Sequence, residues 1–138
     1  MKKLLILFGL IWMMVFRLDA QTTDYKVVFD MSTRDSVSQQ ALIREVQLIK
    51  DNNPQAKIEV VVYGQGINLI LLGKSKNAES ITRLAADPNI NFKVCAFTMK
   101  RFQVDETNLV PGVTVVPDGI YEIISKQREG WGYIKVAH

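Results

Sequence analysis

Lys57-Ile58-Glu59-Val60-Val61-Val62-Tyr63 is the stretch that most clearly decides the fold, and Gly64-Gln65-Gly66 follows it directly. Its centre is an unbroken run of valines, and β-branched residues are typical of strands. The two glycines after it suit a tight turn. The stretch therefore predicts a short β-strand that ends abruptly in a glycine turn.

Other short runs rich in β-branched and aromatic residues lie on both sides of this stretch, and apolar residues recur at helical spacing between them. We predict strands at residues 25–30, 57–63, 92–97, 113–116 and 131–136. Helical segments are predicted at residues 37–49, 67–72, 81–85, 98–102 and 120–127. Strands that alternate with helices imply a parallel sheet covered on both faces. The predicted fold is therefore α/β, with three layers: a five-stranded, mainly parallel sheet between helices.

The amino-terminal twenty residues have the pattern of a secretory signal peptide. Lys2 and Lys3 precede an apolar run of 13 residues, Leu4 to Phe16, and Ala20 is a small residue suited to cleavage after it. The run is short for a membrane span, which needs about 20 residues. We therefore predict a signal peptide at residues 1–20, a single domain at residues 21–138, and a secreted or periplasmic location. An uncleaved membrane anchor is the alternative.

The charge of the predicted mature chain gives no support for nucleic-acid binding. The full chain has 17 basic and 14 acidic residues, and residues 1–20 contain three of the basic and one of the acidic residues. Cleavage would leave a net charge of +1. No basic patch remains that would indicate a nucleic-acid partner.

Cys95 is the only cysteine in the chain and lies near the carboxyl end of the third predicted strand. Ligands of open α/β sheets bind at the carboxyl ends of strands. Exported proteins usually pair their cysteines, and this one has no partner within its own chain. Thr98 and Lys100 follow it where a helix is predicted to start, and Lys100 and Arg101 are cations that could lie close to it. Cys95 is either an inert core residue or a reactive thiol.

Four stretches in this order resemble the DsrE/DsrF-like family of small sulfur-relay proteins, and the resemblance covers essentially the whole predicted mature chain. They are Val60-Val61-Val62-Tyr63-Gly64-Gln65-Gly66, Val94-Cys95-Ala96-Phe97-Thr98-Met99, Leu109-Val110-Pro111-Gly112-Val113 and Gln127-Arg128-Glu129-Gly130-Trp131-Gly132-Tyr133-Ile134. The resemblance implies a five-stranded parallel sheet between helices and assembly into homotrimers or hexamers. It also implies a cysteine that carries sulfur as a persulfide, and that role carries over only to Cys95.

The remaining candidate residues lie near other predicted strand ends. Gly64 and Gly66 are spaced as in a phosphate-binding turn, but the third glycine of the dinucleotide fingerprint is replaced by Leu69. The glycine turn and Cys95 both follow a strand, so they could line the same crevice at the end of the sheet. Asn68 could face that crevice. The candidate binding residues are therefore Gly64, Gly66, Asn68, Thr98 and Lys100, while Asp30, Arg34 and Asp35 follow the first strand.

The chain offers no conventional base or metal site in its sequence. His138 is the only histidine and the last residue, so no Cys-His pair is expected. One cysteine and one terminal histidine are too few for structural zinc. We expect no cofactor and no metal.

Three functional hypotheses follow. The first is an exported DsrE-like homo-oligomer that carries sulfane sulfur as a persulfide on Cys95. It would be a carrier more than a turnover enzyme, exchanging sulfur with a partner protein or a small thiol. The second is a non-catalytic oligomeric binding or assembly module with a buried, structural cysteine. The third is a redox role through an intermolecular disulfide.

Overall fold

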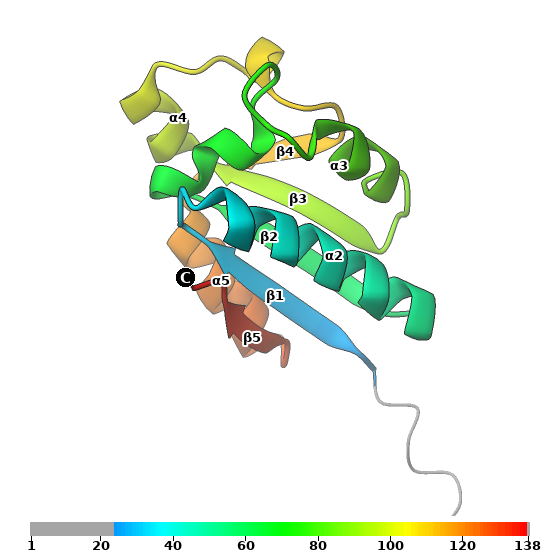
Figure 1. The fold of residues 1–138 in the computed structure, drawn as a ribbon. Coiled ribbons are helices and arrows are strands. Elements are labelled where there is room, and N and C mark those ends of the chain that lie inside the picture. Colours follow the sequence, from blue (N-terminus) through cyan, green and yellow to red (C-terminus); the bar gives the residue numbers. More distant parts are fainter. Residues whose placement is uncertain (1–23, 138) are drawn as a thin grey trace, which may run out of the picture.

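The computed structural model describes residues 24–137, so the predicted signal peptide and His138 lie outside the described residues. The chain forms five strands with helices between them (Figure 1). In order, the elements are β1 (Lys26–Met31), α2 (Ser36–Asn52), β2 (Lys57–Val62), η1 (Gly64–Ile70), α3 (Ala78–Leu84), β3 (Ile90–Cys95), α4 (Ala96–Phe102), η2 (Glu106–Asn108), β4 (Val113–Val116), α5 (Gly119–Arg128) and β5 (Gly132–Lys135). Within residues 24–137, no helix has the length and apolar character needed to cross a bilayer.

The strands form one sheet in the order β4-β3-β2-β1-β5, and every neighbouring pair is parallel. Helices α2 and α3 cover one face of the sheet, and α5 covers the other (Figure 1). The predicted three-layer α/β fold is confirmed. The sheet is wholly parallel because each connection returns the chain to the same edge.

The third strand ends earlier than predicted. It stops at Cys95 rather than at residue 97, and α4 begins directly at Ala96. Cys95 is therefore both the last residue of β3 and the residue that precedes the first turn of α4. Residues 64–70 also differ from an ordinary α-helix, because they form a 3₁₀-helix that starts at Gly64 itself.

The two faces of the sheet bury very different amounts of apolar surface. The face under α2 and α3 holds a large continuous core to which both helices and η1 contribute. The face under α5 holds only Val28, Val61 and Ile123, with Tyr63 and Trp131 packed at its margins. Apolar burial therefore holds α5 in place less strongly than it holds α2.

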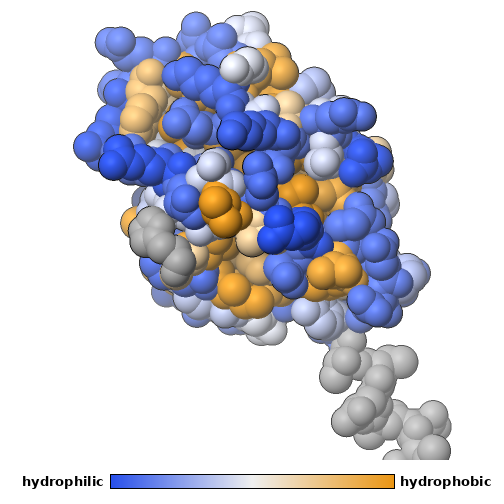
Figure 2. Space-filling view, viewed as in Figure 1, coloured by the Kyte–Doolittle hydropathy of each residue, from blue (hydrophilic) through white to orange (hydrophobic). Residues whose placement is uncertain are grey.

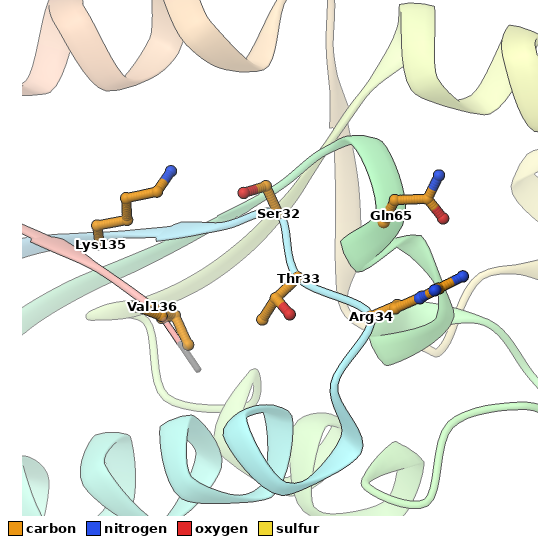
Figure 3. Close-up of a pocket in the computed structure, with 7 residues that line it drawn as sticks. Ser32, Thr33, Arg34, Gln65, Lys135 and Val136 are labelled. Atoms are coloured by element: carbon orange, nitrogen blue, oxygen red, sulfur yellow. The ribbon is translucent and has the colours of Figure 1, made fainter.

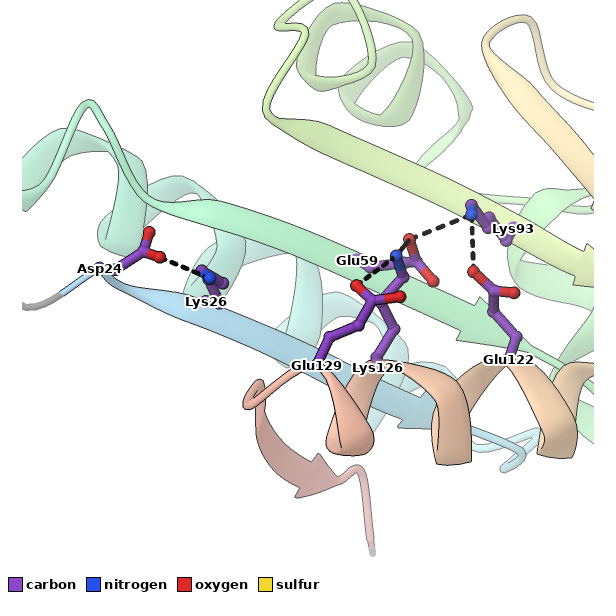
Figure 4. A network of polar contacts seen from close by, with 7 residues as sticks. All are labelled: Asp24, Lys26, Glu59, Lys93, Glu122, Lys126 and Glu129. Carbon is purple, nitrogen blue, oxygen red and sulfur yellow. Dashed lines mark hydrogen bonds and ion pairs between the residues drawn. The ribbon is translucent and has the colours of Figure 1, made fainter.

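A network of charged side chains supplements this small core (Figure 4). Glu59 on β2 is 1% exposed. Its Oε2 lies 3.2 Å from Lys93 Nζ on β3 and 3.9 Å from Lys126 Nζ on α5. Lys93 Nζ also lies 2.7 Å from Glu122 Oε1, and Lys126 Nζ 3.3 Å from Glu129 Oε2. Three carboxylates thus face two ammonium groups between the sheet and α5.

Glu59 is the member of this network whose carboxylate is buried without full hydrogen bonding. Its Oε1 is buried and has no hydrogen-bond partner among the described residues. Burial, together with the neighbouring Glu122 carboxyl, raises the pKa of Glu59 to about 7, against the opposing effect of Lys93. Glu59 can therefore be protonated near neutral pH.

We expect the stability of the protein to fall as Glu59 ionises. The pKa of Glu59 in the folded protein lies above the 4.5 of an ordinary glutamate, so the folded state holds this proton more tightly than the unfolded state. The resulting stability is complete below about pH 4.5 and is lost as the pH rises through about 7. Urea unfolding should show wild type losing on the order of 2 kcal/mol relative to Glu59→Gln between about pH 5 and about pH 8.

Glu79 is the matched control, because it is exposed on α3 and lies outside the network. Glu79→Gln should follow the pH profile of wild type. Parallel profiles for wild type and Glu59→Gln would show that Glu59 does not hold a proton in the folded state.

Candidate functional site

Cys95 lies at the carboxyl edge of the sheet, on the face that α5 covers. The residue is 6% exposed. It pairs in register with Val116 of β4, so the chain segment that leads into α5 passes beside it. A Cβ on Gly119 would lie 3.1 Å from Cys95 Cβ, which means that the first residue of α5 packs directly on the cysteine. Cys95 is thus enclosed by β3, α4 and the start of α5.

A cavity of about 340 Å³ lies beside the cysteine. Its lining comes from β3, α4, the turn after β2 and the start of α5: Tyr63, Gly64, Cys95, Phe97, Thr98, Arg101, Asp118 and Ile120. Phe97 is 68% exposed and Ile120 is 56% exposed. Cys95 has little solvent-accessible surface, but it lines a cavity that is large enough for a small molecule.

Two charged side chains line this cavity. Arg101 is exposed on α4. Asp118 precedes α5, and its Oδ1 accepts hydrogen bonds from the backbone amides of Ile120 at 2.9 Å and Tyr121 at 3.2 Å. Asp118 therefore caps α5 while its carboxylate remains at the wall of the cavity.

Of the two cations that follow Cys95, only one lies at the cavity. Arg101 lines the cavity, whereas Lys100 is exposed and is not among the lining residues. Thr98 is buried, and its Oγ1 accepts a hydrogen bond from the Gly64 amide at 2.9 Å. Thr98 therefore joins α4 to the start of η1 and helps to fix the wall of the cavity.

The glycine turn has a packing role that the sequence did not reveal. A Cβ on Gly66 would lie 2.5 Å from the Met31 carbonyl oxygen, so η1 can approach β1 this closely only with glycine there. Gly64 has a φ of +56° and lines the cavity. Asn68 is exposed and is not among the residues that line the Cys95 cavity. Of the two glycines and Asn68, only Gly64 is brought to Cys95.

A second cavity of about 480 Å³ lies at the ends of β1 and β5 (Figure 3). It is lined by Ser32, Thr33, Arg34, Gln65, Lys135, Val136 and Ala137. Arg34 thus lines a crevice, but not the one that contains Cys95. Asp35 caps α2, and its Oδ2 accepts a hydrogen bond from the Ser38 amide at 2.8 Å.

Asp30, near the end of β1, is buried. Its Oδ2 accepts a hydrogen bond from the Tyr133 hydroxyl at 2.6 Å and lies 3.4 Å from Lys135 Nζ. This hydrogen bond raises the pKa of Tyr133 to about 12. Burial, and then the Asp30 carboxylate, also raise the pKa of Tyr63. Both tyrosines therefore remain protonated hydrogen-bond donors at neutral pH.

Sequence reasoning missed Tyr63 and Asp118 as neighbours of Cys95. The signal for Asp118 was the Pro117-Asp118-Gly119 helix start directly after β4, the strand that pairs with β3. Within residues 24–137, no group of three or more His, Cys, Asp or Glu residues is arranged to hold a metal ion.

Comparison with known proteins gives a family match and similar structures. A model of the DsrE/DsrF-like family matches residues 26–136. A search of curated proteins gives no significant match.

Three solved structures share the fold. MTH1491 from Methanobacterium thermoautotrophicum, described as a protein of unknown function, is 31% identical, with a TM-score of 0.75 over 81% of this chain and 99% of that one. BT1422 from Bacteroides thetaiotaomicron, a conserved protein of unknown function, is 18% identical, with a TM-score of 0.68 over 86% and 100%. The ychN protein from E. coli is 11% identical, with a TM-score of 0.66 over 82% and 99%. The last two show similarity of fold alone.

We expect Gly66→Ala to destabilise the protein by about 2 kcal/mol or more, because the new Cβ would collide with main chain that cannot turn aside. Gly73→Ala is the control. Gly73 has a φ of +75°, but nothing lies within 4 Å of its added Cβ. Its cost should be backbone strain of about 1 kcal/mol. Urea unfolding measures both, and an equal or smaller loss in Gly66→Ala would contradict the packing role.

Proposed function

Because the chain belongs to the DsrE/DsrF-like family, we propose that it carries sulfane sulfur as a persulfide on Cys95. One observation carries the proposal: the only thiol of the chain lines a cavity at the carboxyl edge of the sheet. The segment around Cys95 also resembles the cysteine segment of the family. Both point to a thiol that is placed for chemistry.

Sulfur transfer to Cys95 needs no oxidant. The Cys95 thiolate attacks the outer sulfur of a donor persulfide, and a new S–S bond forms at Cys95 Sγ. The S–S bond of the donor breaks, and the donor thiolate leaves with the electron pair. A second thiolate can later take the outer sulfur by the same exchange.

The surroundings of the thiol suit a carrier better than a hydrolase. Cys95 shares its cavity with one cationic side chain, Arg101, and directly precedes the first turn of α4. The eight residues that line the cavity contain no histidine, so the thiol has no imidazole base beside it. A thiol in this setting can accept and hold sulfur without a hydrolytic step.

Mass spectrometry of the intact folded protein tests the carrier role. After treatment with a small-molecule persulfide, wild type should gain the mass of one sulfur atom, and Cys95→Ser should gain none. The conditions are set so that a free small thiol is persulfidated. Failure of folded wild type to gain sulfur under those conditions would contradict the proposal.

The second candidate function is a binding or assembly module in which Cys95 is structural. The observation that favours it is the low exposure of Cys95 under Gly119. In that case Cys95 would gain sulfur only in denaturant. The same mass measurement, made on folded and on urea-unfolded protein, separates the two functions.

We also propose that the chain is exported and forms homotrimers or homohexamers. The outer face of α5 supports an assembly, because Ile120, Tyr121 and Ile124 are 56%, 62% and 41% exposed. The opposite face of the molecule carries hydrophobic patches separated by hydrophilic side chains (Figure 2). Light scattering that gives the mass of a single chain would contradict the assembly.

An uncleaved amino terminus in protein from the periplasm would contradict removal of the signal peptide.

A further inference from the structure

The cavity beside Cys95 holds two opposite charges that do not neutralise each other. Arg101 from α4 and Asp118 from the start of α5 both line it. No ion pair joins them in the described part of the chain. Two opposite charges that line one small cavity and are not paired with each other suit a ligand that carries both signs.

Asp118 and Arg101 each retain hydrogen-bonding capacity. Both backbone amides that bind Asp118 donate to its Oδ1, which leaves Oδ2 for a further donor. The Arg101 guanidinium lies over the Phe102 ring, 6.0 Å from its centroid. A guanidinium can bind a carboxylate through two parallel hydrogen bonds, and a carboxylate accepts readily from an ammonium group.

The rest of the lining limits the size and character of the ligand. Tyr63, Phe97 and Ile120 give the cavity apolar walls, and Cys95 supplies the sulfur. A volume of about 340 Å³ suits a small molecule with a short apolar stem. The ligand that fits these features has one carboxylate, one ammonium group and a reactive group on a short stem.

We propose that this cavity binds the α-amino-acid end of a low-molecular-weight persulfide, with its carboxylate on Arg101 and its ammonium group on Asp118. The outer sulfur then faces Cys95 Sγ and is transferred by the exchange described above. The inference rests on the proposed function and names the class of its donor. Cysteine persulfide is the simplest member of this class.

Binding can be measured without sulfur transfer. S-methylcysteine has the same amino-acid end and stem but no sulfur to transfer. N-acetyl-S-methylcysteine lacks the ammonium group, and the methyl ester of S-methylcysteine lacks the carboxylate. Titration of each into ¹⁵N-labelled protein, followed by two-dimensional NMR, gives affinities and locates the binding site from the amides that shift.

Three variants connect the affinities to the two charges. Arg101→Gln removes the cation. Asp118→Asn removes the negative charge but keeps the cap of α5, because Asn also caps helices. Lys100→Gln is the matched control, because Lys100 is exposed on the same helix and does not line the cavity.

We expect wild type and Lys100→Gln to bind S-methylcysteine roughly fivefold more tightly than either derivative, as for a partly exposed charge pair. Arg101→Gln should lose the preference for the free carboxylate, and Asp118→Asn the preference for the free ammonium group. Equal affinity for all three compounds in wild type would overturn the inference. So would the absence of saturable shifts around Cys95, or an equal loss for all three compounds in both variants.

The two proposals fail separately. If S-methylcysteine binds as expected but Cys95 never gains sulfur, the cavity assignment stands and the carrier role is wrong. If Cys95 gains sulfur while wild type binds the three compounds equally, the carrier role stands and the donor class is wrong.

Discussion

The packing of α5 on its face of the sheet is the contact on which the candidate site depends. The helix begins in close contact with Cys95, and its first residue, Gly119, leaves little room for a side chain there. A Cβ there would lie 3.1 Å from Cys95 Cβ and 3.2 Å from Val61 Cγ1. The close approach brings Asp118 to the cavity and covers the thiol. The packing of α5 that hides Cys95 from solvent therefore also forms part of the cavity beside it.

The two ends of α5 are attached by different forces. At its start, Gly119 packs on Cys95 and Val61, and Ile123 joins the small apolar cluster one turn later. Towards its end, Lys126 extends from the helix to the buried Glu59 carboxylate. Lys126 favours the ionised form of Glu59, but the burial of this carboxylate without full hydrogen bonding makes its ionisation costly. The cover over Cys95 therefore belongs to the part of the fold with the least apolar burial.

Much of the fold could be predicted from the sequence because it follows from local patterns. Valine-rich strands alternate with helical spacing, and this pattern alone predicts a parallel sheet covered on both faces. The position of Cys95 at a strand end was also predictable. The choice between Lys100 and Arg101 was not, because it depends on how α4 is rotated when Thr98 and Met99 become buried. Asp118 joins the site only through the register of β4 with β3. Glu59 alternates with apolar residues, a pattern that does not reveal whether its side chain is buried.

The central claim is that Cys95 is a cysteine in a cavity that small molecules reach in the folded state, although its own exposure is low. The rate at which iodoacetamide alkylates Cys95, measured at urea concentrations below the unfolding transition, tests this claim most directly. The account predicts alkylation of the folded protein at a rate that does not depend on urea in this range. A rate that rises in proportion to the unfolded fraction, and vanishes in its absence, would show that Cys95 is a closed core residue and would contradict the account.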